Sequence, residues 1–481
     1  MRPSILVIFA CFIVLVGCKV GPNYKEPKAS TPPDWTSSMA RGETNGSVEL
    51  AGWWKKFGDT NLDEYIAIAV RSNLTLLTAE AHVREARAQE GVVAGELWPS
   101  LGAGAGYSKS RYGQNTFPPL PSTVPLTYNL YNANFDAAWE LDVFGGTRRA
   151  VEAANAQIAA AEYSERDVLV SVLAEVAREY INARAAQQHL IIAQENIKAE
   201  QDVLSLTTNR YANGLGNDVD VQQARAALAN TVANLPVYQT AFQQSVYSLA
   251  VLLGQEPGAL MDEMSAEKNI PLTPPFVPVG LPSELLQRRP DVQVAERKLA
   301  AATADIGVAK SDLFPKFSLT GIAGFQSQSA GTWIKAASRY YSVGPTIQWN
   351  LFQGGSIRAN IRVQNARQEQ ALDQYQQTVL TALQDTESAL TAYAKEQDRR
   401  DSLEQSVDAS QQAYDLSTQL YKNGLIDFLR VLVSQTQLDV ARDALVQSDQ
   451  TVSLDLVQLY KALGGGWQEE TNQPASVSTT Q

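Results

Sequence analysis

The chain has 481 residues, with 51 acidic and 39 basic side chains and a formal net charge of −12 at pH 7. This negative balance argues against nucleic acid as a partner, because phosphate binding needs clustered lysine and arginine. With two cysteines and two histidines, the chain offers no paired-cysteine metal site, phosphate-binding glycine loop or nucleophile elbow. We therefore expect no catalytic residue, no bound metal and no cofactor, and the protein is predicted not to be an enzyme.

The first 17 residues have the pattern of an export signal. Arg2 precedes an apolar run over 5–17, which is shorter than the ~20 residues that a membrane-spanning helix needs. The run ends in LVGC, which resembles the lipobox of bacterial lipoproteins. That resemblance implies cleavage before Cys18, a diacylglycerol on its thiol and an acyl group on the new amino terminus. Lys19 then implies sorting to the outer membrane; the alternative is an uncleaved anchor or an ordinary signal.

The rest of the chain contains an internal repeat. In one order along the chain, LWPSLGAGAGYSKS matches LFPKFSLTGIAGFQSQS, WELDVFGGTRRA matches QWNLFQGGSIRA, and RYANGLGNDVDV matches LYKNGLIDFLRV. The sequence therefore predicts a tandem duplication, in which each copy contains a helix, a β-hairpin, a long helix and a second helix.

Four segments alternate apolar and polar residues with the period of two that is typical of strands. The clearest is 129–143, with Tyr, Ala, Phe, Trp and Leu on one face and Asn, Asp and Glu on the other. Strands of ten or more residues can cross a bilayer when tilted (~9–11 residues). Trp98, Trp139 and Trp349 lie toward strand ends, where interfacial aromatic residues belong. The pattern favours membrane strands over a soluble sheet packed on a helix.

Four strands cannot close a barrel, and lipid does not tolerate an open sheet edge. Two chains would supply about eight strands, whose side chains fill the interior, whereas three would supply about twelve and leave a lumen. The polar faces favour three chains. The Pro-rich and Ser-rich loop between the first two strands is expected on the extracellular side.

Two long segments repeat apolar residues every seven positions, which predicts supercoiled helices. The first runs over 147–211 and would measure roughly 98 Å at ~1.5 Å per residue, with Thr147 as its expected cap. Its partner begins near Asp218 and contains Pro236, which should kink it. A second set of positions seven residues apart in the long helix is polar: Gln187, Gln194 and Gln201. These glutamines predict that one side of the helix faces water inside a channel.

Four stretches, CKVGPNYKEP, LLQRRPDVQVAERKLAAATADIGVAKSDLFPKFSLTG, RYANGLGNDVDV and LYKALGGGW, closely resemble the lipoprotein branch of the TolC-like outer-membrane factors. These are the exit ducts of resistance-nodulation-division efflux systems. The resemblance implies a mixed α/β membrane protein in the outer membrane of a Gram-negative bacterium. Its trimeric twelve-stranded β-barrel, with four strands per chain, would be continuous with a long periplasmic α-helical barrel. The implied partners are two sibling chains, outer-membrane lipid, a periplasmic membrane-fusion adaptor and an inner-membrane resistance-nodulation-division transporter.

The family pattern divides the chain into six expected segments, with hairpins at about 97–143 and 313–352. They are a signal peptide (1–17), a lipid-anchored linker and equatorial segment (18–59), a first repeat (60–253), a Pro-rich equatorial connector (254–281), a second repeat (282–466) and a polar tail (467–481).

The resemblance places the periplasmic tip at two helix-to-helix turns, YANGLGND and YKNGLIDF. Each contains a glycine, Gly214 or Gly424, that can take the positive φ ending a helix. Related lipoprotein ducts carry a leucine, an acid four residues later and then an arginine along the second tip helix. Leu429 matches the leucine, but Val433 and Thr436 occupy the other two positions. The charged part of that gate is therefore not reproduced.

Three aspartates, Asp218, Asp220 and Asp427, stand near these turns. Threefold symmetry would triple each charge, so they could supply a carboxylate ring at the constriction. The alternative is that they cap helix N-termini, as Asp218 is well placed to do. The sequence does not say which residues close the channel, or whether its resting state is closed.

The sequence favours a passive efflux duct for drugs or other small toxic solutes. The first alternative is a duct of the same architecture in a type I protein secretion system. A different class, an envelope coiled-coil scaffold or a lipoprotein enzyme, would need no barrel. The cargo and the cognate pump and adaptor cannot be read from the sequence.

Overall fold

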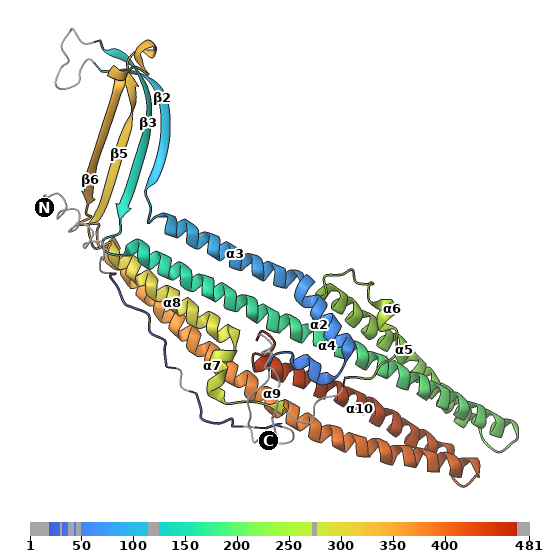
Figure 1. The fold of residues 1–481 in the computed structure, drawn as a ribbon. Coiled ribbons are helices and arrows are strands. Elements are labelled where there is room, and N and C mark those ends of the chain that lie inside the picture. The colour runs from blue at the N-terminus through green and yellow to red at the C-terminus, as the bar shows by residue number, and fades with distance from the viewer. Residues whose placement is uncertain are drawn as a thin grey trace, which may run out of the picture. The chain divides into compact units, whose positions relative to one another are not determined.

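The computed structural model of the chain describes residues 19–28, 31–36, 43–44, 50–113, 125–271 and 277–468 (Figure 1). The described residues form two compact units. Of the described residues, the first unit draws on those in 19–28, Val83–Ala161 and Ala295–Tyr375, and it contains the main sheet. The second draws on Ala29–His82, Glu162–Val294 and Gln376–Gln481, and it is mainly helical.

The two halves of the chain contain helices of matching length. The pairs are α3 (Leu74–Gly95) with α8 (Pro290–Ser311), each of 22 residues, α4 (Gly146–Ala212) with α9 (Ser356–Lys422), each of 67, and α5 (Asp218–Leu252) with α10 (Phe428–Ala462), each of 35. This agreement confirms the tandem repeat that the sequence predicts.

Four antiparallel strands form the sheet of the first unit, in the order β2-β3-β5-β6 (Figure 1). They are β2 (Ser100–Arg111), β3 (Thr127–Leu141), β5 (Lys316–Ser327) and β6 (Arg339–Gln348). The pairing aligns Leu101, Ala137, Gly321 and Val343 in one cross-strand row. Because side chains alternate along a strand, the register places the predicted apolar residues on one face. Within the described residues, β2 pairs only with β3 and β6 only with β5.

The junctions between the sheet and the helices repeat at the level of single hydrogen bonds. The indole N–H of Trp139 donates to the carbonyl of Leu97 at 2.9 Å, and that of Trp349 donates to the carbonyl of Leu313 at 3.1 Å. The expected cap of α4 is wrong in detail. The backbone N–H of Thr147 donates to the carboxylate of Asp142 at 3.2 Å, so the cap comes from the residue that directly follows β3.

In the second unit, the linker before the first repeat meets the connector between the repeats. The two-residue strands β1 (Glu43–Thr44) and β4 (Val277–Pro278) pair in parallel. The indole N–H of Trp35 donates to the carbonyl of Gly280 at 2.8 Å. Trp53, which is 1% exposed, stacks on Tyr460 of α10 with ring centroids 5.1 Å apart. These contacts join segments that are far apart in the sequence.

The heptad seams of the long helices are buried in this unit. Val176 and Ala183 of α4 and Val452 and Leu459 of α10 are at most 4% exposed. Helix α5 continues through Pro236, whose carbonyl accepts a hydrogen bond from the Thr240 hydroxyl at 2.7 Å. In the part of the chain that the structure describes, no helix has the length and apolarity to cross a membrane.

The predicted polar column of α4 needs a correction. Gln187 is 6% exposed, and its amide nitrogen donates to the carbonyl of Ala266 in the connector at 3.1 Å. Gln194 and Gln201 are exposed. Gln187 therefore helps to hold the connector, because a buried amide needs partners, and it does not belong to a wet surface.

In the first unit, the segment after residue 18 is held against two helices. The side chain of Arg149, only 1% exposed, donates to the carbonyls of Val20 at 3.0 Å and Gly21 at 3.4 Å. A Cβ on Gly21 would lie 2.5 Å from Cα of Gly307 in α8, and Gly21 has φ of 94°. Close backbone approach therefore requires glycine on both sides of this crossing.

We predict that Gly307→Ala destabilises the chain, although alanine is the better helix former by about 1 kcal/mol. The new Cβ would lie 2.7–2.9 Å from the Arg149 side chain, and such overpacking typically costs about 1–3 kcal/mol. Thermal unfolding of the purified protein in detergent, followed by circular dichroism, measures the effect.

The matched control is Gly91→Ala in α3, where nothing lies within 4 Å of the place that the new Cβ would take. It should leave the unfolding temperature unchanged or raise it slightly. Equal unfolding temperatures for the two variants would show that the crossing is not tightly packed.

Candidate channel site

The two helix-to-helix turns at the end of the second unit have nearly the same backbone geometry. Gly214 has φ of 71° and Gly424 has φ of 73°. In the first turn, the N–H of Gly214 donates to Tyr211 O at 2.9 Å and that of Leu215 donates to Arg210 O at 2.8 Å. The second turn repeats both bonds at 2.9 Å. This pattern satisfies the last carbonyls of α4 and α9 and needs a left-handed residue, for which glycine is preferred.

The helices that follow these turns begin with different caps. The Asn217 side chain accepts from the N–H of Asp220 at 2.9 Å at the start of α5. Asp427 accepts from the N–H of Arg430 at 3.2 Å at the start of α10. The capping role expected of Asp218 therefore belongs to Asn217. Asp218 is exposed in the first helical turn, where a negative charge favours the helix dipole.

Arg210 connects the two turns, and sequence reasoning did not single it out. Its guanidinium donates to the carbonyls of Tyr421 at 3.1 Å, Lys422 at 3.4 Å and Leu215 at 3.4 Å. The guanidinium carbon also lies 4.7 Å from the centre of the Tyr421 ring. Leu420 stands at the matching position of the second repeat. Arg210 of α4 therefore binds the second turn, but α9 has no matching arginine to bind the first turn.

A small apolar cluster supports the second turn. Tyr421 and Phe428 are 4% and 1% exposed, and their rings lie 5.7 Å apart. Phe428 occupies the position that Asp218 holds in the first repeat. Burial raises the pKa of the Tyr421 hydroxyl. The repeats have diverged here: the second turn has an apolar anchor, whereas the first presents carboxylates to solvent.

One face of α10 near the turn is apolar and exposed. Leu429, Val433 and Val440 are 54%, 57% and 65% exposed, and Thr436 on the same face is exposed. Their spacing of four, three and four residues places them on one side of the helix. Asp218 accepts a hydrogen bond from the Gln222 side-chain amide at 3.2 Å, and Asp427 caps α10. Their part in a gate, and that of Asp220, stays a prediction.

A buried carboxyl group, Glu200 of α4, lies near α5 and the half-buried Asp439 of α10. Glu200 is 4% exposed and accepts from the Thr231 hydroxyl at 2.9 Å. Burial, with Asp439 nearby, raises the pKa of Glu200 to about 7. Burial also raises the pKa of Asp439 to about 6, against the lowering effect of Arg442. Burial therefore favours the protonated form of Glu200 relative to an exposed glutamate.

The polar face of the sheet is matched by glycines on its first strand. Gly102 lies opposite Asp136, and Gly106 lies opposite Asn132. A Cβ on Gly102 would lie 2.8 Å from an Asp136 carboxylate oxygen, and one on Gly106 would lie 2.9 Å from the Asn132 amide oxygen. The glycines thus leave room for the polar side chains of β3 to extend across β2.

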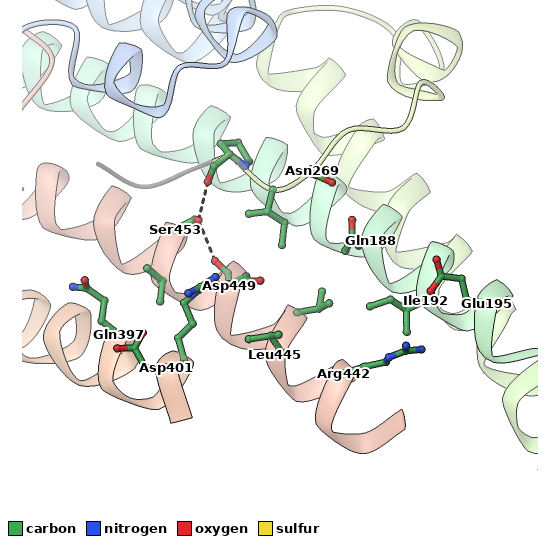
Figure 2. Close-up of a pocket in the computed structure, with 15 residues that line it drawn as sticks. Gln188, Ile192, Glu195, Asn269, Gln397, Asp401, Arg442, Leu445, Asp449 and Ser453 are labelled. Carbon is green, nitrogen blue, oxygen red and sulfur yellow. Dashed lines mark hydrogen bonds and ion pairs between the residues drawn. The ribbon is translucent and has the colours of Figure 1, made fainter. Parts of the chain in front are cut away.

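An open groove of about 680 Å³ lies between α4, α9, α10 and the connector. Figure 2 shows residues that line it. Apolar residues such as Leu445 line it together with charged residues such as Asp401 and Arg442. The Ser453 hydroxyl in its wall donates to the carbonyl of Pro271 at 3.3 Å. In the described part of the chain, no cluster of three or more potential metal ligands occurs.

The predicted lipidation site, Cys18, lies outside the described residues, as does the tail from residue 469 onward. Trp467 is described, and its indole N–H donates to the carbonyl of Arg288 at 2.8 Å.

Comparison with known proteins identifies the family. The model of the Outer membrane efflux protein family matches residues 66–255 and 281–465. The pyoverdine export outer membrane protein OpmQ of Pseudomonas aeruginosa is 32% identical over 470 residues, which cover 97% of this chain and 98% of that protein. The probable efflux pump outer membrane protein TtgC of Pseudomonas putida is 31% identical over 486 residues, which cover 100% of this chain and 99% of that protein.

Among solved structures, that of the outer-membrane channel OprN is similar with a TM-score of 0.87 and 35% identity, covering 94% of this chain and 100% of that one. The fold class predicted for each chain is confirmed, with four strands per chain and duplicated long helices. The chain belongs to the outer membrane efflux protein family, and it is an outer-membrane efflux channel with the TolC-like fold.

Proposed function

We propose that three copies of this chain form a lipid-anchored exit duct that works with a periplasmic adaptor and an inner-membrane resistance-nodulation-division pump. The observation that carries the proposal is the four-stranded sheet, which has one apolar face, one polar face and two edges without partners among the described residues. Edges must pair in a membrane. Three copies would supply about twelve strands, enough to surround a water-filled lumen.

The alternative is a duct of the same fold in a type I protein secretion system. The names of OpmQ and TtgC refer to pyoverdine export and to an efflux pump, and these relatives support the first reading. The alternative predicts that deletion of the gene stops secretion of a protein and leaves sensitivity to toxic solutes unchanged.

The lipid anchor is supported by the position of the residues after Cys18. The N–H of Val20 donates to the carbonyl of Phe144 at 3.1 Å, at the junction of β3 and α4. Lys19 forms an ion pair with Glu152 of α4 at 3.1 Å. The described residues that directly follow Cys18 in the sequence therefore lie at the base of the strands, which supports a lipid anchor at that end of the sheet. That is where a lipid in the periplasmic leaflet would be.

We predict that Cys18→Ser abolishes incorporation of labelled palmitate into the protein. The hydroxyl of serine does not replace the thiol that accepts the diacylglycerol. Metabolic labelling followed by immunoprecipitation measures this. Cys11→Ser is the control and should label like the parent chain; continued labelling of the Cys18 variant would refute the anchor.

The gate is proposed on the exposed face of α10. Because Val433 and Thr436 replace the acid and the arginine of related gates, three copies of Leu429 and Val433 would form apolar rings. Apolar constrictions close a pore by excluding water. A gate of this kind needs no ion pair to hold it shut.

We predict that the double variant Leu429→Ala with Val433→Ala raises single-channel conductance several-fold in planar bilayers. The smaller side chains widen the constriction and weaken the exclusion of water. Leu416→Ala on α9 is the control, because Leu416 is similarly exposed, at 61%, but lies on another helix. Absence of conductance from both the parent and the double variant would contradict the duct itself, whereas equal, measurable conductance of the two would contradict only this gate.

The Arg210 tie is proposed to hold the two turns of the tip together. We predict that Arg210→Ala speeds amide hydrogen exchange in residues 420–428 by at least about tenfold, because hydrogen bonds from charged groups stabilise by about 1.5–3 kcal/mol. Mass spectrometry of peptides from the two turns measures the rate.

Arg225→Ala is the control for this variant. Arg225 is exposed on α5, and its guanidinium bonds only the Gln222 side chain, at 3.4 Å, among the hydrogen bonds of the described residues. Exchange that is equally slow in parent and Arg210→Ala would show that the turns hold together without the arginine.

A further inference from the structure

The charges of the four strands are sorted by face. Six charged residues lie in the strands: Lys109, Arg111, Asp136, Glu140, Lys316 and Arg339. The register places Asp136, Glu140 and Lys316 on the polar face, where Lys316 lies 3.8 Å from Glu140. The other three lie on the apolar face. Lys109 is two residues after Tyr107 on the same strand, and Arg339 pairs with Phe325. All charges on the apolar face are therefore positive.

These three cations are at the loop end of the sheet. Lys109 and Arg111 end β2, and Arg339 begins β6. Tyr107 and Tyr131 mark the same level on the apolar face, with ring centroids 4.8 Å apart, and Trp333 lies 6.1 Å from Tyr131. Aromatic residues of this kind mark the boundary between hydrocarbon and headgroups. A lipid-facing cation is costly at the bilayer midplane but much less so near this boundary.

The loop end supplies no counter-charge. No Asp or Glu occurs in residues 97–135 or 313–368, although the whole chain carries 51 of them. Lys109, Arg111 and Arg339 are exposed, and they form no ion pair with any of the described residues. Lys335 in the loop before β6 adds a fourth cation. These cations are therefore accessible to an anion from outside the chain.

The cations also lie only on the edge strands. β2 and β6 are the two edges of the sheet, so barrel closure places Arg339 of one copy on the strand next to Lys109 and Arg111 of another. Like charges on neighbouring strands repel. An anionic ligand bound across each subunit junction would remove this repulsion and hold two copies together.

An apolar groove of about 770 Å³ lies on the sheet below these cations. Alanines 103, 105, 133 and 323 are among its lining residues, together with Phe135 and Phe325. Small side chains between larger aromatic ones leave room for acyl chains. We propose that each subunit junction binds a phosphorylated, multiply acylated glycolipid of the outer leaflet, with its phosphates on these cations and its acyl chains over the apolar face. A ligand with more than one phosphate suits three or four cations better than a phospholipid with one.

This inference rests on the proposed trimeric duct, and one preparation tests both. The full-length protein in detergent is titrated with rough-chemotype lipopolysaccharide, and native mass spectrometry measures binding and the temperature of trimer dissociation. We expect binding to the parent trimer and a rise of several degrees in that temperature. In the variant with Lys109, Arg111 and Arg339 all changed to Gln, binding should weaken by about 100-fold, at about 1 kcal/mol per charge.

Lys316→Gln is the matched control, because Lys316 is a strand cation on the polar face, and it should bind the glycolipid like the parent. Arg339→Gln alone keeps the test valid if the triple variant does not fold, and it should weaken binding by several-fold. Dephosphorylated lipopolysaccharide should bind poorly to the parent.

Equal binding by parent and triple variant, or by phosphorylated and dephosphorylated glycolipid, would overturn the inference. Equal stabilisation by cardiolipin would overturn the commitment to a glycolipid. Conductance of the same preparation in planar bilayers distinguishes failure of this inference from failure of the proposed duct. A conducting trimer that does not bind the glycolipid contradicts only this inference, whereas a monomer without conductance contradicts the proposed duct.

Discussion

The constraint on which the rest of this protein depends is the pairing of backbone groups in hydrocarbon. A backbone N–H or C=O left without a partner there costs several kcal/mol, and each chain supplies only four strands. The apolar face of the sheet commits it to lipid, while its edge strands β2 and β6 need neighbours. The proposed assembly of several copies around a lumen follows from this shortage of strands.

Duplication supplies the repeated parts, and small departures from the repeat supply specialised ones. The helices match in length, and Trp139 and Trp349 make the same junction bond. At the tip the copies differ: Arg210 has a leucine as its counterpart, and Asp218 has Phe428. One turn is thus solvated and acidic, and the other is anchored in an apolar cluster. A tip built in this way can be held together by a few polar contacts and can separate without disrupting a large core.

Buried arginines hold distant segments to the long helices. Arg149 binds the carbonyl of Val20, Arg184 binds that of Ala266 at 2.8 Å, and Arg289 binds that of Ala462 at 3.2 Å. Each is at most 8% exposed. A guanidinium has five donors in a fixed plane, so one side chain can bind carbonyls from segments that form no regular structure together. Within each unit, these contacts position the amino-terminal segment, the connector and the start of α8.

The sequence by itself determined the elements and their repetition. Alternation with a period of two and of seven reports which side of a strand or helix is apolar, and this was sufficient to predict the four strands, their lipid face and the heptad seams. The glycines of the two turns were also readable, because a left-handed position strongly favours glycine. Local chemistry was less reliable: the caps of α4 and α5 come from Asp142 and Asn217, since several polar residues near a helix start compete for the same N–H groups.

Only the tertiary structure decided which distant residues meet. Gln187 has the spacing of a wet helix face, yet it is buried because the connector covers it. The Arg210 tie, the glycine crossing at Gly21 and Gly307, and the gathering of outward-facing cations on edge strands depend on contacts or strand order between segments far apart in the chain. Periodicity describes one element at a time, whereas partners and edges are properties of the packed chain, and so these features could not be read from the sequence alone.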